Sequence, residues 1–241
     1  VLNRCDPGRP AAIRIRICNM DEEYLGEFSY GSGSGDGQLR WPVAIAFDSQ
    51  ERVFITDEQN HRISIYDSSG AFLSKWGVPG SGEGEVNGPA GIAINGDDNV
   101  FVVDQHNHRV QKFTADGQFL ARFGSYGTGR GELNRPSSVT VDSDGDVYIC
   151  DWANDRVQVF SPEGKYLTSF AGDAQELTKW AEAVVGTNPG AVRRRREVKN
   201  MDIEWRLSMP TGVRFDPEKN RLLIVCLLYT SPSPRDLSTS R

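Results

Sequence analysis

The sequence predicts an all-β protein, a β-propeller made of four-stranded antiparallel blades. The first observation is an internal period of 47 residues, shared by a proline, an aspartate and an arginine. The positions that recur are Pro42, Pro89 and Pro136, then Asp57, Asp104 and Asp151, and finally Arg62, Arg109 and Arg156. The second observation is the alternation of apolar and polar residues in short segments between glycine-containing turns, which is typical of half-buried strands joined as hairpins.

Each repeat unit contains four such segments. In the second unit they are Gly91 to Ile94, Asn99 to Val103, Arg109 to Phe113 and Phe119 to Phe123. A single sheet of this kind would leave apolar side chains exposed on both faces, so neighbouring sheets must stack to bury them. Residues 31–172 therefore predict three full 47-residue blades that follow one another.

Partial repeats flank these three units. Residues 1–30 are expected to supply the last strands of a preceding blade, because Ile15 to Gly31 repeats the pattern that starts at Ile63. Residues 207–228 are expected to supply the first strands of a further blade. The chain would then form an open arc, unless the two partial blades pair, Ile13 to Phe28 with Val213 to Val225, and close a four-bladed ring.

Two segments interrupt the repeat. Residues 173–206 form an insertion in one inter-blade loop, where Asp173 and Glu176 resemble a helix start and apolar residues follow at helical spacing. We expect a short helix there, followed by the basic run Arg193, Arg194, Arg195 and Arg196. Residues 229–241 have no periodicity and are expected to be a disordered tail, for which an origin outside the native protein is one interpretation.

Composition excludes several classes of function. The formal charge of −6 argues against a surface that attracts nucleic acid, and residues 31–172 carry 19 acidic against 11 basic side chains. The cysteines Cys5, Cys18, Cys150 and Cys226 lie too far apart in sequence for the close pairs of zinc or redox motifs, so neither a metal nor another cofactor is expected. No apolar run reaches the roughly 20 residues of a membrane span. The cellular compartment is not indicated.

The four segments of the second unit resemble the NHL repeat. They read Pro-x-Gly-Ile-Ala, Asn-Val-Phe-Val-Val-Asp, Asn-x-Arg-Val-Gln-x-Phe and Asp-Gly-x-Phe-Leu-x-x-Phe-Gly, and the resemblance extends over Ile13 to Val225. NHL proteins are commonly six-bladed, so the resemblance implies that about two blades lie outside this chain. They include kinase sensor domains, RNA-binding propellers and a peptide-amidating lyase, so the resemblance implies a shape rather than one activity. The metal-binding histidines of the lyase have no visible counterpart here.

Most of the charged, amide, glycine and histidine residues that could suggest a functional site recur in more than one unit. Recurrence favours an architectural role, because a catalytic group is needed only once. This interpretation covers the acidic, amide and basic side chains between the second and third strands, namely Asp57, Asn60, Arg62, Asp104, Asn107, Arg109, Asp151, Asn154 and Arg156. It also covers the glycine-rich loops 31–37, 77–84 and 124–131, which precede a strand rather than the helix that a phosphate loop requires. His61 and His108 share one repeat slot and are likewise expected to be structural, whereas His106 breaks the pattern.

The candidate ligand-binding residues are those that vary between units on one face. In a propeller, the inter-blade loops and the loops between second and third strands emerge together around the central channel. The varying residues there are Arg40, Trp41, Gln59, His106, Arg135, Trp152 and Met209. Tryptophan and arginine give large contact energies per residue, although Trp41 and Trp152 could equally pack between blades.

Three functions compete. The first is a non-catalytic binding module that takes a protein or a small extracellular ligand on the channel face. The second is an RNA-binding propeller, which family precedent and the basic run favour but the acidic blades oppose. The third is a metal-dependent lyase or hydrolase, for which His106 would need ligands from outside the recognisable repeats.

Overall fold

In the computed structural model, residues 2–3, 13–19, 21–28, 30–172 and 207–226 are described, and their regular secondary structure is almost entirely β-strand. Three four-stranded antiparallel sheets follow one another, as the repeat predicts. The first blade contains β4 (Pro42–Phe47), β5 (Val53–Asp57), β6 (Arg62–Tyr66) and β7 (Phe72–Trp76). The second contains β10 (Pro89–Ile94), β11 (Val100–Asp104), β12 (Arg109–Phe113) and β13 (Phe119–Phe123). The third contains β16 (Ser138–Val141), β17 (Val147–Asp151), β18 (Arg156–Phe160) and β19 (Tyr166–Phe170).

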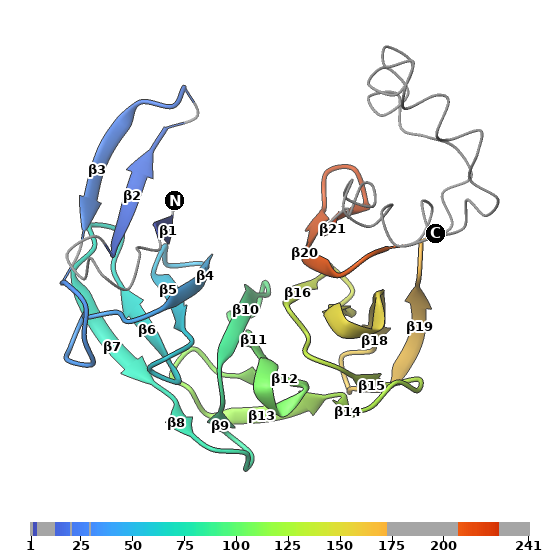
Figure 1. Ribbon diagram of the computed structural model, residues 1–241. Helices are drawn as coiled ribbons and strands as arrows, with labels where there is room; N and C mark the ends of the chain where they lie inside the picture. The colour runs from blue at the N-terminus through green and yellow to red at the C-terminus, as the bar shows by residue number, and fades with distance from the viewer. Residues whose placement is uncertain (1, 4–12, 20, 29, 173–206, 227–241) are drawn as a thin grey trace, which may run out of the picture.

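The blades form an open arc, in which β4, β10 and β16 lie on the inner side and β7, β13 and β19 on the outer side (Figure 1). A three-stranded sheet stands at one end, formed by β1 (Leu2–Asn3), β2 (Arg14–Cys18) and β3 (Tyr24–Phe28). A two-stranded sheet stands at the other end, formed by β20 (Pro210–Asp216) and β21 (Arg221–Cys226). The described strands of these two sheets are not paired with each other, so the four-bladed ring is not formed. The predicted helical insertion and the predicted C-terminal tail lie outside the described residues.

The apolar core lies between the blades rather than inside any one of them. Because successive residues of a strand point to opposite faces, each blade presents one apolar face to each neighbour. Between the first and second blades the buried cluster includes Phe54, Ile63, Ile65, Val100, Val102 and Phe113. Between the second and third it includes Phe101, Val103, Phe123, Val147, Ile149 and Phe160. Two smaller clusters attach the partial sheets, so each blade is stabilised mainly by its neighbours.

The glycine-rich connectors contain short parallel strand pairs, β8 (Val78–Pro79) with β9 (Glu85–Val86) and β14 (Ser125–Tyr126) with β15 (Glu132–Leu133). In the first of these loops, the Gly82 amide donates to the Glu85 carboxylate at 2.8 Å. A Cβ at Gly80 would lie 2.1 Å from an oxygen of the same carboxylate, so a larger residue there would displace the Glu85 side chain. The amide that a phosphate would need is thus already bound by the carboxylate of the loop itself.

Candidate ligand-binding rim

The inter-blade connectors and the loops between second and third strands lie against each other and form one surface. We call this surface the rim, defined as residues 40–41, 58–61, 87–88, 105–108, 134–135, 152–155 and 208–209. Backbone hydrogen bonds join the two kinds of loop at equivalent places. The amides of Glu58 and Gln105 donate to the carbonyls of Trp41 and Gly88, at 2.9 and 3.3 Å. The amides of His106 and Ala153 donate to the carbonyls of Asn87 and Asn134, both at 3.1 Å.

A buried corner of polar side chains supports the rim in each blade. In the second blade, the Asp104 carboxylate accepts from the Asn87 amide at 2.6 Å, from Arg109 Nε at 2.7 Å and from Gln111 Nε2 at 3.1 Å. It also accepts from the side-chain amide of Asn107. Arg109 continues to the carbonyls of the glycine-rich connector, and Asp151, Asn154, Arg156 and Gln158 repeat the arrangement in the third blade. The corner side chains therefore form their hydrogen bonds with other groups of the protein.

The corner of the first blade is less complete. Asp57 accepts from the backbone amides of Arg40 and Trp41, both at 2.8 Å, and Arg62 donates to connector carbonyls. However, Ser64 occupies the place that Gln111 and Gln158 hold in the other blades. Arg62 Nε and Ser64 Oγ are buried and have no hydrogen-bond partner among the described residues. Sequence comparison of the repeats could have found this difference, because the glutamine recurs at the repeat spacing and the serine breaks it.

A side chain at the end of each of these loops links one blade to the next. His61 and His108 accept through Nδ1 from the amides of Gly88 and Arg135, at 3.1 and 3.0 Å. Asp155 occupies the same slot in the third blade and accepts from Met209 at 2.7 Å. Sequence reasoning treated the two histidines as structural but did not single out Asp155, whose signal was its position 47 residues after His108.

Two of the candidate ligand-binding residues have left-handed backbones. Arg135 has φ of 51° and Met209 has φ of 42°, at the slot where the second blade has Gly88 with φ of 63°. A side chain at such a φ costs conformational energy that glycine avoids. Arginine and methionine are therefore tolerated where glycine would be the unstrained choice.

The other candidates are distributed along the arc. Arg40, Gln59, His106 and Arg135 are exposed, whereas Trp41, Trp152 and Met209 are half-buried. Trp152 begins the 3₁₀ turn η3 (Trp152–Asn154), and His106 lies within the equivalent turn η2 (Gln105–Asn107). The turns place His106 on the second blade and Trp152 on the third, and a hydrogen bond from its backbone amide places Arg135 beside His108.

The protonation of His108 is affected by its burial and by charged groups nearby. Burial lowers the pKa of His108, and the positive charges of Arg135 and His106 lower that pKa further, while Asp151 opposes them. The ring of Tyr126 packs on His108, with centroids 4.5 Å apart. The imidazole of His106 lies against Gly88, where an added Cβ would be 2.6 Å from Nδ1.

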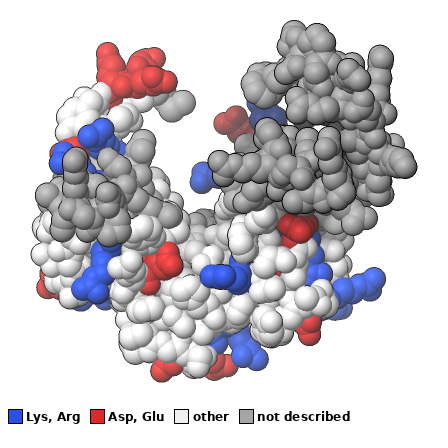
Figure 2. All heavy atoms as spheres, viewed as in Figure 1, with Lys and Arg blue, Asp and Glu red and all other residues white. Residues whose placement is uncertain are grey.

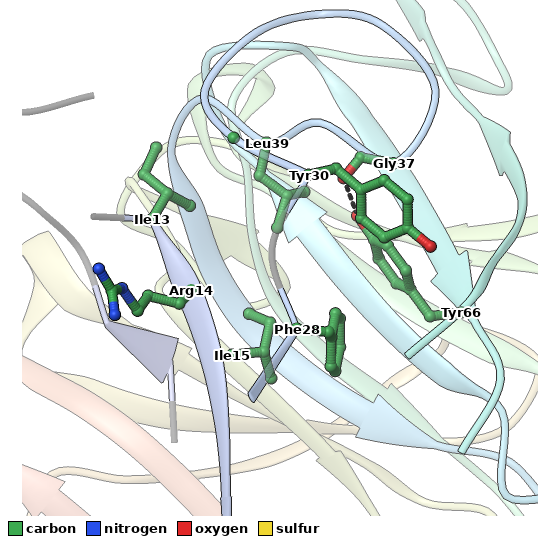
Figure 3. Close-up of a pocket in the computed structure, with 9 residues that line it drawn as sticks. Ile13, Arg14, Ile15, Phe28, Tyr30, Gly37, Leu39 and Tyr66 are labelled. Carbon is green, nitrogen blue, oxygen red and sulfur yellow. Dashed lines mark hydrogen bonds between the residues drawn. The ribbon is translucent and has the colours of Figure 1, made fainter. Parts of the chain in front are cut away.

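Other features of the described residues were considered as sites. No group of three or more histidine, cysteine or acidic residues in the described ranges is arranged to hold a metal ion. A small pocket lies between the N-terminal sheet and the first blade, where Ile15, Phe28, Leu39 and Tyr66 line it and Tyr66 donates to the Gly37 carbonyl at 2.8 Å (Figure 3). None of the residues that line this pocket belongs to the rim. Within the described ranges, no helix is long and apolar enough to cross a membrane.

Comparison with known proteins gives partial matches of one kind. The sequence model of the NHL repeat matches residues 133–160, and a model described as a 6-bladed beta-propeller matches residues 44–121. Protein lin-41 of Caenorhabditis elegans is 40% identical over 72 residues, which are 28% of this chain and 6% of that protein. The match therefore covers a small part of its curated relative.

Solved structures resemble the arc at low sequence identity. Virginiamycin B lyase from Staphylococcus aureus has a TM-score of 0.55 and 17% identity, with 88% of this chain and 56% of that chain covered. A protein of unknown function from Bacteroides caccae has a TM-score of 0.54 and 16% identity, with 88% and 61% covered. At such identities the likeness concerns the fold alone. The recurring corners, the stacked four-stranded sheets and the sequence matches over residues 44–121 and 133–160 together make this chain a β-propeller that is similar to the NHL-repeat proteins.

Proposed function

We propose that this propeller is a non-catalytic binding module that takes a protein ligand on the rim. One observation carries the proposal. The polar groups that recur in every blade are hydrogen-bonded within the corners, whereas Arg40, Gln59, His106 and Arg135, which differ between blades, are exposed. A surface with a constant support and a variable display is suited to recognition rather than to one reaction.

The energetic contribution would come from few residues. Trp41 and Trp152 are half-buried on the rim of two different blades, and Arg135 lies between them along the chain. Aromatic and guanidinium side chains that become desolvated on binding commonly dominate interface energies. NHL propellers generally act as interaction modules, which supports this proposal at the level of the family.

The experiment compares partner capture by three rim variants, Trp41→Ala, Arg135→Ala and Trp152→Ala. Each is expected to weaken the capture of proteins retained by the wild-type chain at least tenfold, since hot-spot truncations cost about 2 kcal/mol or more. Leu120→Ala is the matched control, because Leu120 is an exposed apolar residue on the outer strand β13. Unchanged capture by all three rim variants would refute the proposal.

RNA binding and a metal-dependent lyase or hydrolase activity receive less support from the described residues. The blades carry 19 acidic against 11 basic side chains over residues 31–172, and both signs are interspersed on the face in Figure 2. Such a surface is unfavourable for a polyanion. The basic run at Arg193 to Arg196, which motivates RNA binding, lies outside the described residues. A lyase activity is supported only by the exposed His106 and by the likeness in fold to virginiamycin B lyase.

A further inference from the structure

Two histidines and one arginine lie near one another on the rim, namely His106, His108 and Arg135, and the backbone amide of Arg135 donates to His108 Nδ1. Two adjacent blades build this cluster: the loop after β11 supplies the histidines, and the connector that follows the second blade supplies the arginine. The position of His106 holds Gln59 and Ala153 in the other units. The position of Arg135 holds Trp41, Gly88 and Met209. The cluster is thus specific to one place on the arc.

The acidic side chain beside the cluster is already occupied. Asp151 acts on His108, but its carboxylate accepts from the Asn134 amide, Asn154, Arg156 and Gln158. No ion pair of Arg135 is found among the described residues. The three groups also act on one another, since Arg135 and His106 both disfavour a proton on His108. The exposed guanidinium of Arg135, without an ion pair in the part of the chain that the structure describes, is therefore available to an anion from outside.

The hydrogen-bonding state of His108 makes it a donor. Because Nδ1 accepts from the Arg135 amide at 3.0 Å, the neutral imidazole must carry its proton on Nε2. A guanidinium matches the two oxygens of a carboxylate in a bidentate arrangement. An Nε2–H donor and a guanidinium fork are the groups with which proteins bind a single carboxylate.

We propose that His106, His108 and Arg135 form a subsite for one carboxylate of a protein partner, either an aspartate or glutamate side chain or a chain terminus. The inference rests on the proposed binding function and specifies its ligand chemistry. A single carboxylate interacts with the cluster over a few ångströms, whereas a polyphosphate would extend over the acidic blades. The local and the long-range charge together therefore select an isolated negative group.

The test is a titration of the full chain with acetyl-Gly-Glu-Gly-amide, followed through the imidazole NMR signals of its 3 histidines. We expect saturable shifts of the His106 and His108 signals, a raised His108 pKa and a Kd on the order of millimolar, as suits one small contact. The matched uncharged peptide, acetyl-Gly-Gln-Gly-amide (the Gln peptide), should leave these signals unchanged. Equal shifts by the Gln peptide would overturn the proposal.

Arg135→Gly is the informative variant, because glycine relieves the left-handed backbone while the guanidinium is lost. This variant should keep the fold. Its affinity for the Glu-containing peptide should fall about tenfold or more, because charged hydrogen bonds are lost. Arg122→Ala, an exposed position on β13, removes the same charge away from the rim and should leave binding unchanged. Equal weakening by both variants would overturn the subsite and indicate nonspecific attraction.

An oligouridylate that bound more tightly than the Glu peptide and competed with it would also overturn the carboxylate assignment. The failure of the proposed function is distinguishable from these outcomes. If the peptide fails to bind but Trp41→Ala and Trp152→Ala still abolish partner capture, the module binds by other chemistry and only the subsite is wrong.

Discussion

The first blade and the two blades after it share the same corner aspartate, asparagine and arginine, but their networks differ. In the second blade, Gln111 donates to the Glu85 carbonyl at 2.7 Å and accepts from the Gly84 amide at 3.1 Å, besides its bond to Asp104. In the first blade Ser64 is too short for these contacts, and it and Arg62 Nε stay unsatisfied among the described residues. The corner is therefore a network of four side chains, and the fourth decides whether the corner carboxylate and the connector have a further buried hydrogen bond.

The largest expected effect comes from removing the corner carboxylate. Asp104→Ala should lower the free energy of unfolding by about 3–5 kcal/mol, because it leaves the buried Arg109 without the ion pair that Nε now makes at 2.7 Å. Asp57→Ala should cost less, about 1–3 kcal/mol, since Arg62 bonds to carbonyls instead. Urea unfolding of both variants measures the difference. Equal losses would show that the two corners are energetically alike.

Gln111→Ser gives the second blade the residue of the first. We expect a loss of roughly 1–3 kcal/mol, because the Gly84 amide and the Asp104 carboxylate each lose a buried partner. Gln118→Ser, at an exposed position just before β13, is the matched control and should change stability little. Thermal unfolding of both variants provides the measurement. A neutral Gln111→Ser would mean that water replaces the amide without cost.

The reverse exchange should improve the first blade. Ser64→Gln combined with Tyr66→Phe reproduces the residues of the second blade and can supply hydrogen bonds to Asp57 and the connector, as Gln111 does to Asp104 and Glu85. A gain of about 1 kcal/mol is expected, the usual net value of a buried hydrogen bond. Tyr66→Phe alone separates out the loss of the bond from the Tyr66 hydroxyl to Gly37. If the double variant is less stable than that single variant, the serine is better accommodated than its unpartnered oxygen suggests.

The smallest effect concerns pH and the links between blades. The pKa of His108 is lowered in the folded protein, so its contribution to stability is fully present above the unfolded value, about 6.5, and is lost as the pH falls through the lower folded pKa. His108→Asp imitates Asp155, whose carboxylate accepts the equivalent bond from Met209. Lowering the pH from 7.5 to 5 should therefore reduce the free energy of unfolding of the wild type more than that of this variant. Urea unfolding at each pH measures the two curves. Parallel curves would contradict a role of His108 protonation.

The parts of the molecule that repeat were predictable to the level of individual strands. The second blade starts at Pro89 and its second strand ends at Asp104, within two residues of the segments expected from the alternation. The Asp, Asn and Arg corner was also predictable, because recurrence at one period separates an architectural group from a catalytic one. The role of Gln111 was not, since a polar residue in an alternating strand is expected to face solvent and here it is fully buried.

The candidate rim was predictable as a set of positions but not as a site. Which residues vary between units can be counted in the sequence, and Arg40, Trp41, Gln59, His106, Arg135, Trp152 and Met209 were chosen on that basis. The gathering of His106 and Arg135 around His108 was not visible, because it depends on a bond between residues 27 positions apart in two blades. The left-handed backbone of Arg135 was equally hidden, since the equivalent glycine belongs to another unit.

The sequence by itself determined the blade, because strand alternation, turn glycines and buried corners are encoded within one 47-residue unit and repeat with it. Only the tertiary structure decided how the units are joined: which faces stack, that the described partial sheets remain apart at the ends of an arc, and which side chains meet across a blade boundary. The physical reason is that a blade buries its apolar faces and satisfies its connector only against the next blade. The contacts that shape the rim therefore belong to pairs of units and to no single one.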